Sequence, residues 1–310
     1  MQSCDIIIIG SGVAGMSAAG YAARAGRNVM ILEGLAPGGQ CMYIADVENY
    51  PGLTETVSGY DFGERFENQA KRFGAQTTFA EATAIHKEND RFIIDTSAGQ
   101  WEAKAVILAT GAKHRHLGIE GEETYQGKGV SYCGTCDGPL FRGRRILVVG
   151  GGDTALTDAL YLSQMTDKLT ICHRKDRFRA QENLIRQVED RHITTLMETT
   201  VDRILGDGKH VTGVQLKSVK DGSQRTMETD AVFIFVGIMP QTQLLDKSLL
   251  DDNGYVVTDR VMQTSVPGLF AAGDVRDTPF RQLVTAASDG AIAAHAASEY
   301  IDAVEGHQYR

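Results

Sequence analysis

Two cysteines, Cys133 and Cys136, stand two residues apart in the stretch SYCGTCDG near the middle of the chain. Such a pair can ligate a metal, close a structural disulfide, or cycle between dithiol and disulfide. A metal site needs four ligands, and the scattered remaining cysteines offer no second pair, while the only close histidines are His114 and His116. A disulfide across so short a loop removes little conformational entropy from the unfolded chain. The pattern therefore favours a redox pair, which needs a source of electrons.

A dinucleotide-binding pattern begins with four consecutive isoleucines, followed by Gly10, Gly12 and Gly15 and an alanine-rich segment. The apolar run predicts a strand buried on both faces, and the small residues allow a helix to lie close to it. The glycines permit a tight turn and let backbone N–H groups approach a pyrophosphate. A second strand, 29–32, ends at Glu33, where a carboxylate can accept hydrogen bonds from a ribose. These features in register predict a first dinucleotide site.

The same pattern returns as RILVVGGGDTA, with Gly150, Gly152 and Ala155 in the glycine positions. Glu33 lies 23 residues beyond Gly10, and the same step from Gly150 reaches His173. Cationic residues follow it: Arg174, Lys175, Arg177 and Arg179. Guanidinium and ammonium groups bind a 2′-phosphate that a carboxylate would repel. The second pattern thus indicates NADP rather than NAD, the alternative being a solvated basic turn at the end of a strand.

Each pattern closes with a late apolar strand that ends in glycine, 105–111 in the first and 231–237 in the second. Two related dinucleotide-binding domains in one chain indicate hydride transfer between two cofactors. A further apolar strand, 269–272, precedes Gly273 and Asp274. Periodicity alone leaves open which of the two sheets this strand joins.

The composition agrees with a two-domain α/β protein, since 310 residues with 42% apolar content can bury large cores. A net charge of -9 disfavours nucleic acid as a partner. The longest apolar runs, such as 231–239, are far shorter than the roughly 18 residues of a membrane-spanning helix. No basic segment precedes the first apolar run, so we expect no signal peptide and a cytoplasmic location. That compartment disfavours a structural disulfide.

Taken together, the motifs resemble those of low-molecular-weight flavoprotein thioredoxin reductases. The matching segments run from residue 5 to about 300 in the family's order: GSGVAG, GGQ, VENYPG, ATGA, SYCGTCDG, VVGGGDTA, HRKDRFRA, FIFVGIMPQT and GLFAAGDVRDTPFRQLVTAASDGA. The resemblance implies an α/β protein with two Rossmann-like domains. An NADPH domain, 114–242, would be inserted into a discontinuous FAD domain, 1–113 and 243–310, whose sheet the strand at 269–272 would rejoin.

The resemblance also implies the site residues. Those for FAD are Gly10, Gly12, Gly15, Glu33, Gly39, Gln40, Asn49, Gly111, Gly273, Asp274, Arg281 and Gln282. Those for NADPH are Gly150, Gly152, Asp153, Thr154, His173, Arg174, Lys175 and Arg179. Cys133 and Cys136 would carry the redox chemistry, with Asp137 as the acid that exchanges a proton with a sulfur, although Asp-Gly is also a common turn pair.

The implied reaction passes hydride from NADPH to FAD, electrons from FAD to the disulfide, and then reduces thioredoxin or a thioredoxin-like protein. The scattered cysteines and histidines lead us to expect no metal. The resemblance further implies a homodimer and a domain rotation about the crossings 111–114 and 237–240. Rival hypotheses are a related flavoprotein reductase or oxidase with a different acceptor, and a nucleotide sensor without turnover, which would not need the dithiol.

Some residues depart from the family's usual pattern. CATC is CGTC here, so Gly134 is expected to loosen the turn. HRR is HRK, and because Lys175 lacks the forked geometry of arginine, we expect softer selectivity for NADPH. The stretch 139–141, PLF, replaces a run of bulky aromatics expected to dock thioredoxin. Cys41 and Cys172 are interpreted as small core residues.

Overall fold

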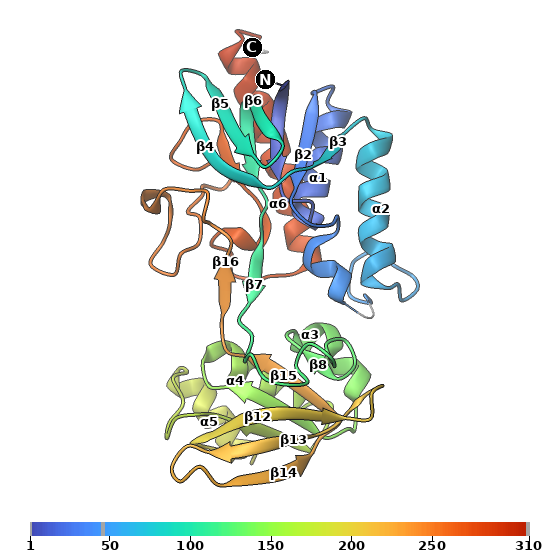
Figure 1. Ribbon diagram of the computed structural model, residues 1–310, viewed down its shortest axis with the longest axis vertical. Coiled ribbons are helices and arrows are strands. Elements are labelled where there is room, and N and C mark those ends of the chain that lie inside the picture. The colour runs from blue at the N-terminus through green and yellow to red at the C-terminus, as the bar shows by residue number, and fades with distance from the viewer. Residues whose placement is uncertain (1, 45–46, 308–310) are drawn as a thin grey trace. The chain divides into compact units, whose positions relative to one another are not determined.

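The computed structural model describes residues 2–44 and 47–307, and the chain divides into two compact units (Figure 1). Unit 1 comprises Met1–Met42, Val47–Lys113 and Met239–Arg310, and unit 2 comprises Tyr43–Asp46 and His114–Ile238. The chain thus leaves unit 1 to form most of unit 2 and then returns.

Unit 1 is built on a mixed sheet. Its strands are β1 (Gln2–Ile9), β2 (Val29–Glu33), β3 (Gln76–Phe79), β4 (Ala82–Glu88), β5 (Arg91–Thr96), β6 (Gly99–Leu108) and β17 (Leu269–Ala271). Its helices are α1 (Val13–Arg24), α2 (Gly59–Arg72) and α6 (Leu283–Val304), with short 3-10 helices η1 (Gly39–Tyr43), η3 (Lys247–Leu249) and η4 (Gly273–Val275). The order is β3-β2-β1-β6-β5-β4, and β1, β2, β3 and β6 run parallel.

The long strand β6 pairs with β1 on one side, and on its other side it has two partners in succession. Its first half pairs antiparallel with β5, and its last residues, Val106 to Leu108, pair in parallel with β17. The late strand β17 therefore joins the sheet of unit 1, as the resemblance implies. After the chain has returned to unit 1, this pairing adds its late strand to the first sheet.

The consecutive isoleucines of β1 are buried on both faces of the sheet, as predicted. Ile6 and Ile8 pack toward α1 and α6, while Ile7 and Ile9 pack on the opposite face with Trp101. Each fully buried side chain of this size contributes about 1.5–3 kcal/mol relative to exposure. The alternation shows why an unbroken apolar run forms a strand covered on both faces.

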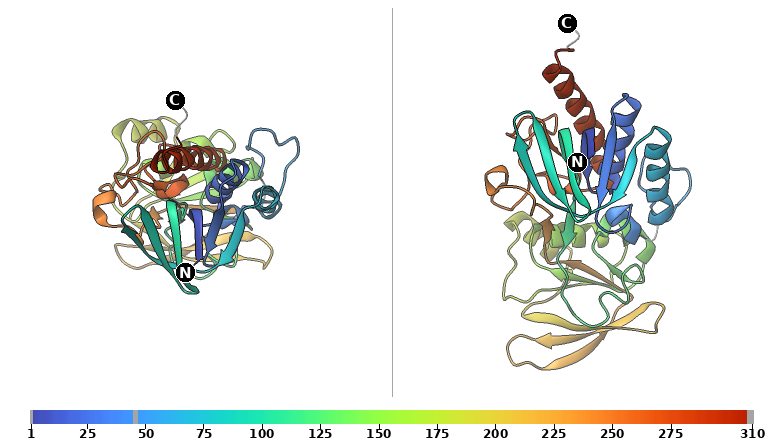
Figure 2. Two further views of the ribbon diagram at one scale, coloured as in Figure 1. Left: turned by 90° about the horizontal axis from the view of Figure 1, so that it is seen from above. Right: turned by 45° about the horizontal axis from the view of Figure 1, so that its top comes forward.

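Helices α1 and α6 lie side by side on one face of the sheet (Figure 2). Gly290 of α6 makes this approach possible, because a Cβ there would lie 2.1 Å from the carbonyl oxygen of Ala14. Ser17 of α1 donates a hydrogen bond of 2.7 Å to the carbonyl oxygen of Ala287. Small residues on both helices thus bring the start of α1 close to the chain that follows β17.

Unit 2 contains a parallel sheet of order β11-β10-β9-β15-β8 and an antiparallel sheet β12-β13-β14. The strands are β8 (Val130–Ser131), β9 (Ile146–Gly150), β10 (Leu169–Cys172), β11 (Thr194–Leu196), β12 (Thr199–Gly206), β13 (Val211–Ser218), β14 (Gln224–Glu228) and β15 (Ala231–Phe235). The helices are α3 (Gly134–Asp137), α4 (Asp153–Leu162), α5 (Glu182–Asp190) and the 3-10 helix η2 (Gly138–Phe141). Ile146 and Val148 of β9 pack with α4, while Leu147 and Val149 pack with β12 and β13. The predicted fold class is confirmed.

The chain crosses between the units at two short strands, β7 (Ala112–His114) and β16 (Ile238–Pro240), which pair with each other. Arg115 N donates to Gly237 O at 2.8 Å, and Gln241 N donates to Gly111 O at 2.9 Å. Among residues 2–44 and 47–307, none of the helices has the length and apolar character needed to cross a membrane.

Candidate active site

The first glycine-rich loop uses its three glycines in different ways. Gly10 has a φ of +102°, and a Cβ there would lie 2.5 Å from the carbonyl oxygen of Ala109. A Cβ at Gly15 would lie 2.0 Å from the carbonyl oxygen of Gly10, so the turn and the close packing of α1 both need glycine. A Cβ at Gly12, in contrast, would meet nothing of the described chain within 4 Å. The open side of Gly12 fits the approach of a pyrophosphate.

Glu33, at the end of β2, points its carboxylate at this loop. It accepts hydrogen bonds from Ser11 N at 2.9 Å, Ser11 Oγ at 2.6 Å and Leu35 N at 2.9 Å. Gly39 approaches the same loop, because a Cβ there would lie 3.0 Å from Gly12 Cα. The acid and both glycine segments predicted from sequence thus meet at the carboxyl ends of β1 and β2, the edge where such sheets bind ligands.

Gly273 and Asp274 reach α1 from the end of β17. A Cβ at Gly273 would lie 2.9 Å from Ala14 Cβ, and burial raises the pKa of Asp274 to about 6. Asp289, buried on α6, accepts a hydrogen bond from Gly273 N at 3.2 Å and pairs with Arg276 at 3.1 Å. Asp289 was not predicted as a site residue, although an acid inside an alanine-rich helix is a sequence signal for it.

Gln40 and Gly111 lie beside the strand that leaves unit 1. The Gln40 side chain donates from Nε2 to the carbonyl oxygen of Ala112. Gly111 has a φ of +68°, and its carbonyl accepts from Gln241. The structure thus places Gln40 next to the crossing segment.

A further contact joins Asn49 to the loop before α6. Asn49 Nδ2 donates to Gln282 Oε1 at 3.1 Å. The neighbouring Arg281 holds its guanidinium 4.4 Å from the ring centre of Tyr255, and its Nε is buried without a hydrogen-bond partner among the described residues. Segments more than 200 residues apart, predicted to share the flavin site, are therefore brought together here.

The second glycine-rich loop repeats the first. A Cβ at Gly150 would lie 2.4 Å from the carbonyl oxygen of Phe235 and 2.7 Å from Ala155 Cβ. A Cβ at Gly152 would meet nothing of the described chain within 4 Å. The end of β15 therefore packs against Gly150 in the same way as the residue after β6 packs against Gly10. The second loop is also open to a pyrophosphate.

The basic segment after β10 is tied to this loop. Arg179 N donates to Gly151 O at 2.7 Å, and Gln181 N donates to the Asp153 carboxylate at 2.7 Å. The His173 ring lies against Gly151, and its buried Nε2 has no hydrogen-bond partner among the described residues. Burial lowers the pKa of His173, and nearby cations lower it further. The predicted side chains exposed at this edge are Asp153, Thr154, Arg174, Lys175 and Arg179. This cationic edge beside an open glycine loop fits a phosphorylated dinucleotide.

Cys133 and Cys136 form a disulfide in unit 2. Cys133 caps the one-turn helix α3, and its Sγ accepts a hydrogen bond from Cys136 N at 3.2 Å. Ser131 Oγ accepts from Cys133 N at 3.1 Å, and Asp137 N donates to Cys133 O at 3.2 Å. Both cysteines are half-buried. A partly accessible disulfide in a short turn is suited to repeated reduction and reoxidation.

Tyr132 anchors the residue before the disulfide. Its hydroxyl donates to Glu122 Oε1 at 2.8 Å and lies 3.0 Å from His116 Nδ1. The buried Glu122 also accepts from Leu117 N at 3.0 Å and Gly118 N at 2.8 Å. Burial and then Glu122 raise the pKa of Tyr132, so the hydroxyl stays a donor. Sequence reasoning missed this network, whose residues are only apparent as partners after folding.

The other cysteines, Cys4, Cys41 and Cys172, are buried free thiols. Burial raises the pKa of Cys41 to about 11 and those of Cys4 and Cys172 to about 12. They are packing residues, as predicted for Cys41 and Cys172. Within residues 2–44 and 47–307, no His, Cys, Asp and Glu side chains gather as a candidate metal site.

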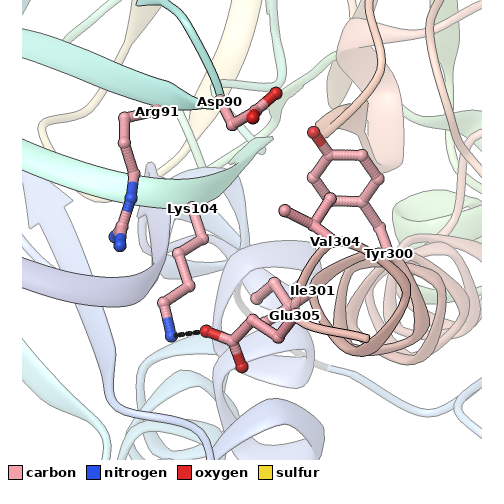
Figure 3. Close-up of a pocket in the computed structure, with 7 residues that line it drawn as sticks. All are labelled: Asp90, Arg91, Lys104, Tyr300, Ile301, Val304 and Glu305. Carbon is pink, nitrogen blue, oxygen red and sulfur yellow. Dashed lines mark ion pairs between the residues drawn. The ribbon is translucent and has the colours of Figure 1, made fainter. Parts of the chain in front are cut away.

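A small pocket of about 60 Å³ in unit 1 lies away from these residues (Figure 3). Its lining residues are Asp90, Arg91, Lys104, Tyr300, Ile301, Val304 and Glu305. Lys104 pairs with Glu305 and with Asp5 near the start of β1, so the pocket is at the opposite edge of the sheet from Gly10. Since ligands bind parallel sheets at the carboxyl ends of the strands, this pocket is not the dinucleotide site.

The structure has two glycine-rich loops that can each admit a dinucleotide, and it has one disulfide in a short turn. Together they define the class of protein, an oxidoreductase that uses dinucleotide cofactors and a redox disulfide. The chain belongs to the pyridine nucleotide-disulphide oxidoreductase family, whose model matches residues 4–290. It is 49% identical over 302 residues to thioredoxin reductase of Treponema pallidum (strain Nichols), covering 97% of this chain and 98% of that protein. It is 44% identical over 300 residues to thioredoxin reductase of Listeria monocytogenes (serovar 1/2a), covering 96% and 94%.

A solved structure shows the same similarity. Thioredoxin reductase from Streptococcus pyogenes matches with a TM-score of 0.93 at 41% identity, covering 97% of this chain and 99% of that one. The predicted enzyme class, an NADPH-dependent flavoprotein disulfide oxidoreductase with FAD and NADPH as cofactors, is confirmed.

Proposed function

We propose that this chain reduces the disulfide of thioredoxin or of a thioredoxin-like protein, using electrons from NADPH. The observation that carries the proposal is the Cys133–Cys136 disulfide, held in the same unit as the cationic glycine loop. Full-length similarity to thioredoxin reductases supports the choice of acceptor. A different disulfide acceptor, or oxygen, is the alternative that the experiment below separates.

The residues of each unit are assigned to one cofactor. In unit 1, Gly12 and Glu33 would hold the pyrophosphate and the adenosine ribose of FAD, and Asp274 would lie near its ribityl chain. In unit 2, Gly152 would admit the pyrophosphate of NADPH, and Arg174 with its basic neighbours would bind the 2′-phosphate. When bound, FAD accepts hydride from NADPH and supplies two electrons to a disulfide. The crossings 111–114 and 237–240, which include the paired strands β7 and β16, remain the predicted hinge.

The cysteine pair carries the second half of the reaction. Opening the Cys133–Cys136 bond takes two electrons and two protons and leaves two thiols. A thiolate of the pair then attacks the partner's disulfide, forming a mixed disulfide and releasing one partner thiolate. The second thiolate attacks the mixed disulfide, which restores the Cys133–Cys136 bond and releases the partner with both electrons. Asp137, adjacent to Cys136, is proposed to pass the proton to or from a sulfur.

The proposed setting is the cytoplasm, where NADPH is available and dithiols stay reduced. A homodimer and the assignment of the FAD and NADPH domains to 1–113 with 243–310 and to 114–242 remain predictions.

The test uses the flavin-loaded protein under anaerobic conditions. We expect NADPH to bleach the flavin absorbance faster than NADH, and NADPH consumption to require thioredoxin. Cys136→Ser should bleach but fail to reduce thioredoxin, while Cys4→Ala, a control at a buried free thiol, should match the wild type. Equal NADPH consumption in air with and without thioredoxin would identify an oxidase instead. A flavin that stays yellow with NADPH would indicate a sensor.

A further inference from the structure

The turn that carries the disulfide docks on helix α4 through two glycines. Gly134 and Gly138 are four residues apart, and they face Asp158 and Leu162, which are also one helical turn apart. A Cβ at Gly134 would lie 2.4 Å from Asp158 Oδ1, and a Cβ at Gly138 would lie 2.6 Å from Leu162 Cδ2. Both glycines are buried. Because both residues are glycines without a side chain, the turn can lie directly against α4.

A hydrogen bond fastens this contact. Gly134 N, between the two cysteines in sequence, donates to Asp158 Oδ1 at 3.1 Å. Gly134 begins helix α3 and is not among the glycines with positive φ, so its backbone does not require glycine. Glycine is instead explained by the room that the Asp158 carboxylate occupies. The structure thus adds a contact to α4 at this residue, and the expectation that Gly134 loosens the turn stays a prediction.

Asp158 is a partly buried acid on a helix whose neighbouring residues Ala155, Leu156 and Ala159 are core. Burial raises the pKa of its carboxyl to about 6, and the Gly134 N–H opposes that rise. A carboxylate in such a place needs the donor it has, since burying an unpaired charge is costly. Neither the glycine motif nor the cationic edge explains its presence.

We propose that Asp158 is a positioning residue for the redox disulfide, anchoring Gly134 N–H so that the two sulfurs stay within reach when their bond opens. A helix of one turn is marginal without tertiary support, and opening the disulfide removes its covalent closure. The anchor on α4 then keeps the dithiol ordered and raises the effective concentration of one thiol near the other. The inference rests on the proposed function, since it assigns Asp158 to the same disulfide.

The direct readout is the equilibrium between dithiol and disulfide. Flavin-loaded protein is equilibrated in mixtures of reduced and oxidised dithiothreitol, and alkylation of Cys133 and Cys136 is counted by mass spectrometry. With Asp158→Ala we expect a shift of about tenfold toward the dithiol, because the opened turn is no longer held on α4 and the effective concentration of one thiol near the other falls. Asp158→Asn keeps an oxygen acceptor and should stay within about threefold of the wild type. Asp190→Ala, at an exposed acid on α5, is the control and should show no shift.

A double-mutant cycle tests whether Gly134 and Asp158 act through the same contact. Gly134→Ala should reproduce the shift of Asp158→Ala, because its Cβ displaces the carboxylate. The double variant Gly134→Ala with Asp158→Ala should shift no further than either single variant, because all three lose the same bond. Fully additive shifts would overturn the anchor. Equal shifts in Asp158→Asn and Asp158→Ala would overturn it as well, since charge rather than the bond would then matter.

Turnover with NADPH and thioredoxin separates this inference from the proposed function. If Cys136→Ser keeps full turnover, the proposed function fails, whatever Asp158 does. If Cys136→Ser is inactive while Asp158→Ala has the wild-type equilibrium and turnover, the function stands and the positioning role is overturned. Flavin content and the midpoint of urea unfolding show which variants fold. If Asp158→Ala does not fold, the comparison of Gly134→Ala and Asp158→Asn with the wild type replaces it.

Discussion

Replacing Gly12 by alanine should separate cofactor binding from folding. Gly12 has a φ of -68° and a ψ of 179°, which alanine adopts without strain, and its Cβ would meet nothing of the described chain within 4 Å. The added methyl would therefore stand only in the space we assign to the FAD pyrophosphate. The matched variant is Gly10→Ala, whose Cβ would lie 2.5 Å from the Ala109 carbonyl oxygen.

The two variants should differ in how far they destabilise the fold and in how far they weaken the binding of FAD. Alanine is a poorer N-cap than glycine, so Gly12→Ala should lower the free energy of unfolding of the apoprotein by at most about 1 kcal/mol. If the methyl removes one or two charge-assisted hydrogen bonds to the pyrophosphate, binding weakens by about 2–4 kcal/mol, roughly 30- to 700-fold in Kd. Gly10→Ala combines a positive φ with a backbone clash, and should destabilise the fold by about 3 kcal/mol or more.

The assay is flavin absorbance of the purified protein, followed by titration of the apoprotein with FAD and by urea unfolding. Gly12→Ala should purify nearly colourless yet unfold close to the wild-type midpoint, whereas Gly10→Ala should lose both flavin and stability. Wild-type affinity for FAD in Gly12→Ala would refute the assignment of this loop to the pyrophosphate.

Further predictions concern the cationic edge and the buried thiols. Arg174→Ala should raise KM for NADPH about tenfold or more and leave KM for NADH unchanged, with Arg186→Ala on α5 as the control; equal effects on both nucleotides would rule out a 2′-phosphate contact. Cys4, Cys41 and Cys172 should resist alkylation at pH 8 in the reduced native protein, since their raised pKa values keep them protonated. Modification of any of them as fast as the redox pair would contradict this burial. Because their pKa values are raised on folding, the stability they contribute is present below about pH 9 and is lost as the pH rises toward 11–12.

Local sequence patterns were enough to predict the main helices and strands and many residues of the candidate site. The isoleucine run, the two glycine loops and the closing strands lie where the sequence predicts them, because a strand buried on both faces and a tight strand-to-helix turn each leave a local composition signal. The same applies to Glu33, whose distance from Gly10 follows from one strand-helix-strand unit. The contact of Gly134 with Asp158 was not predicted, because Asp158 lies 24 residues away and only packing shows the contact.

The sequence by itself determined the fold class, the two dinucleotide sites and the redox pair, since each depends on residue types at short, fixed spacing. FAD as the cofactor of the first site was implied by the resemblance to a family. Tertiary structure alone decided that Asp289 reaches Gly273 and that Asp158 bonds the disulfide turn. The pairing of β17 with β6 was implied by the resemblance, but the periodicity of the sequence left it open. These contacts join segments that are distant in the chain, and which partner a strand or an acid takes depends on the packing of whole helices and sheets, which no local pattern encodes.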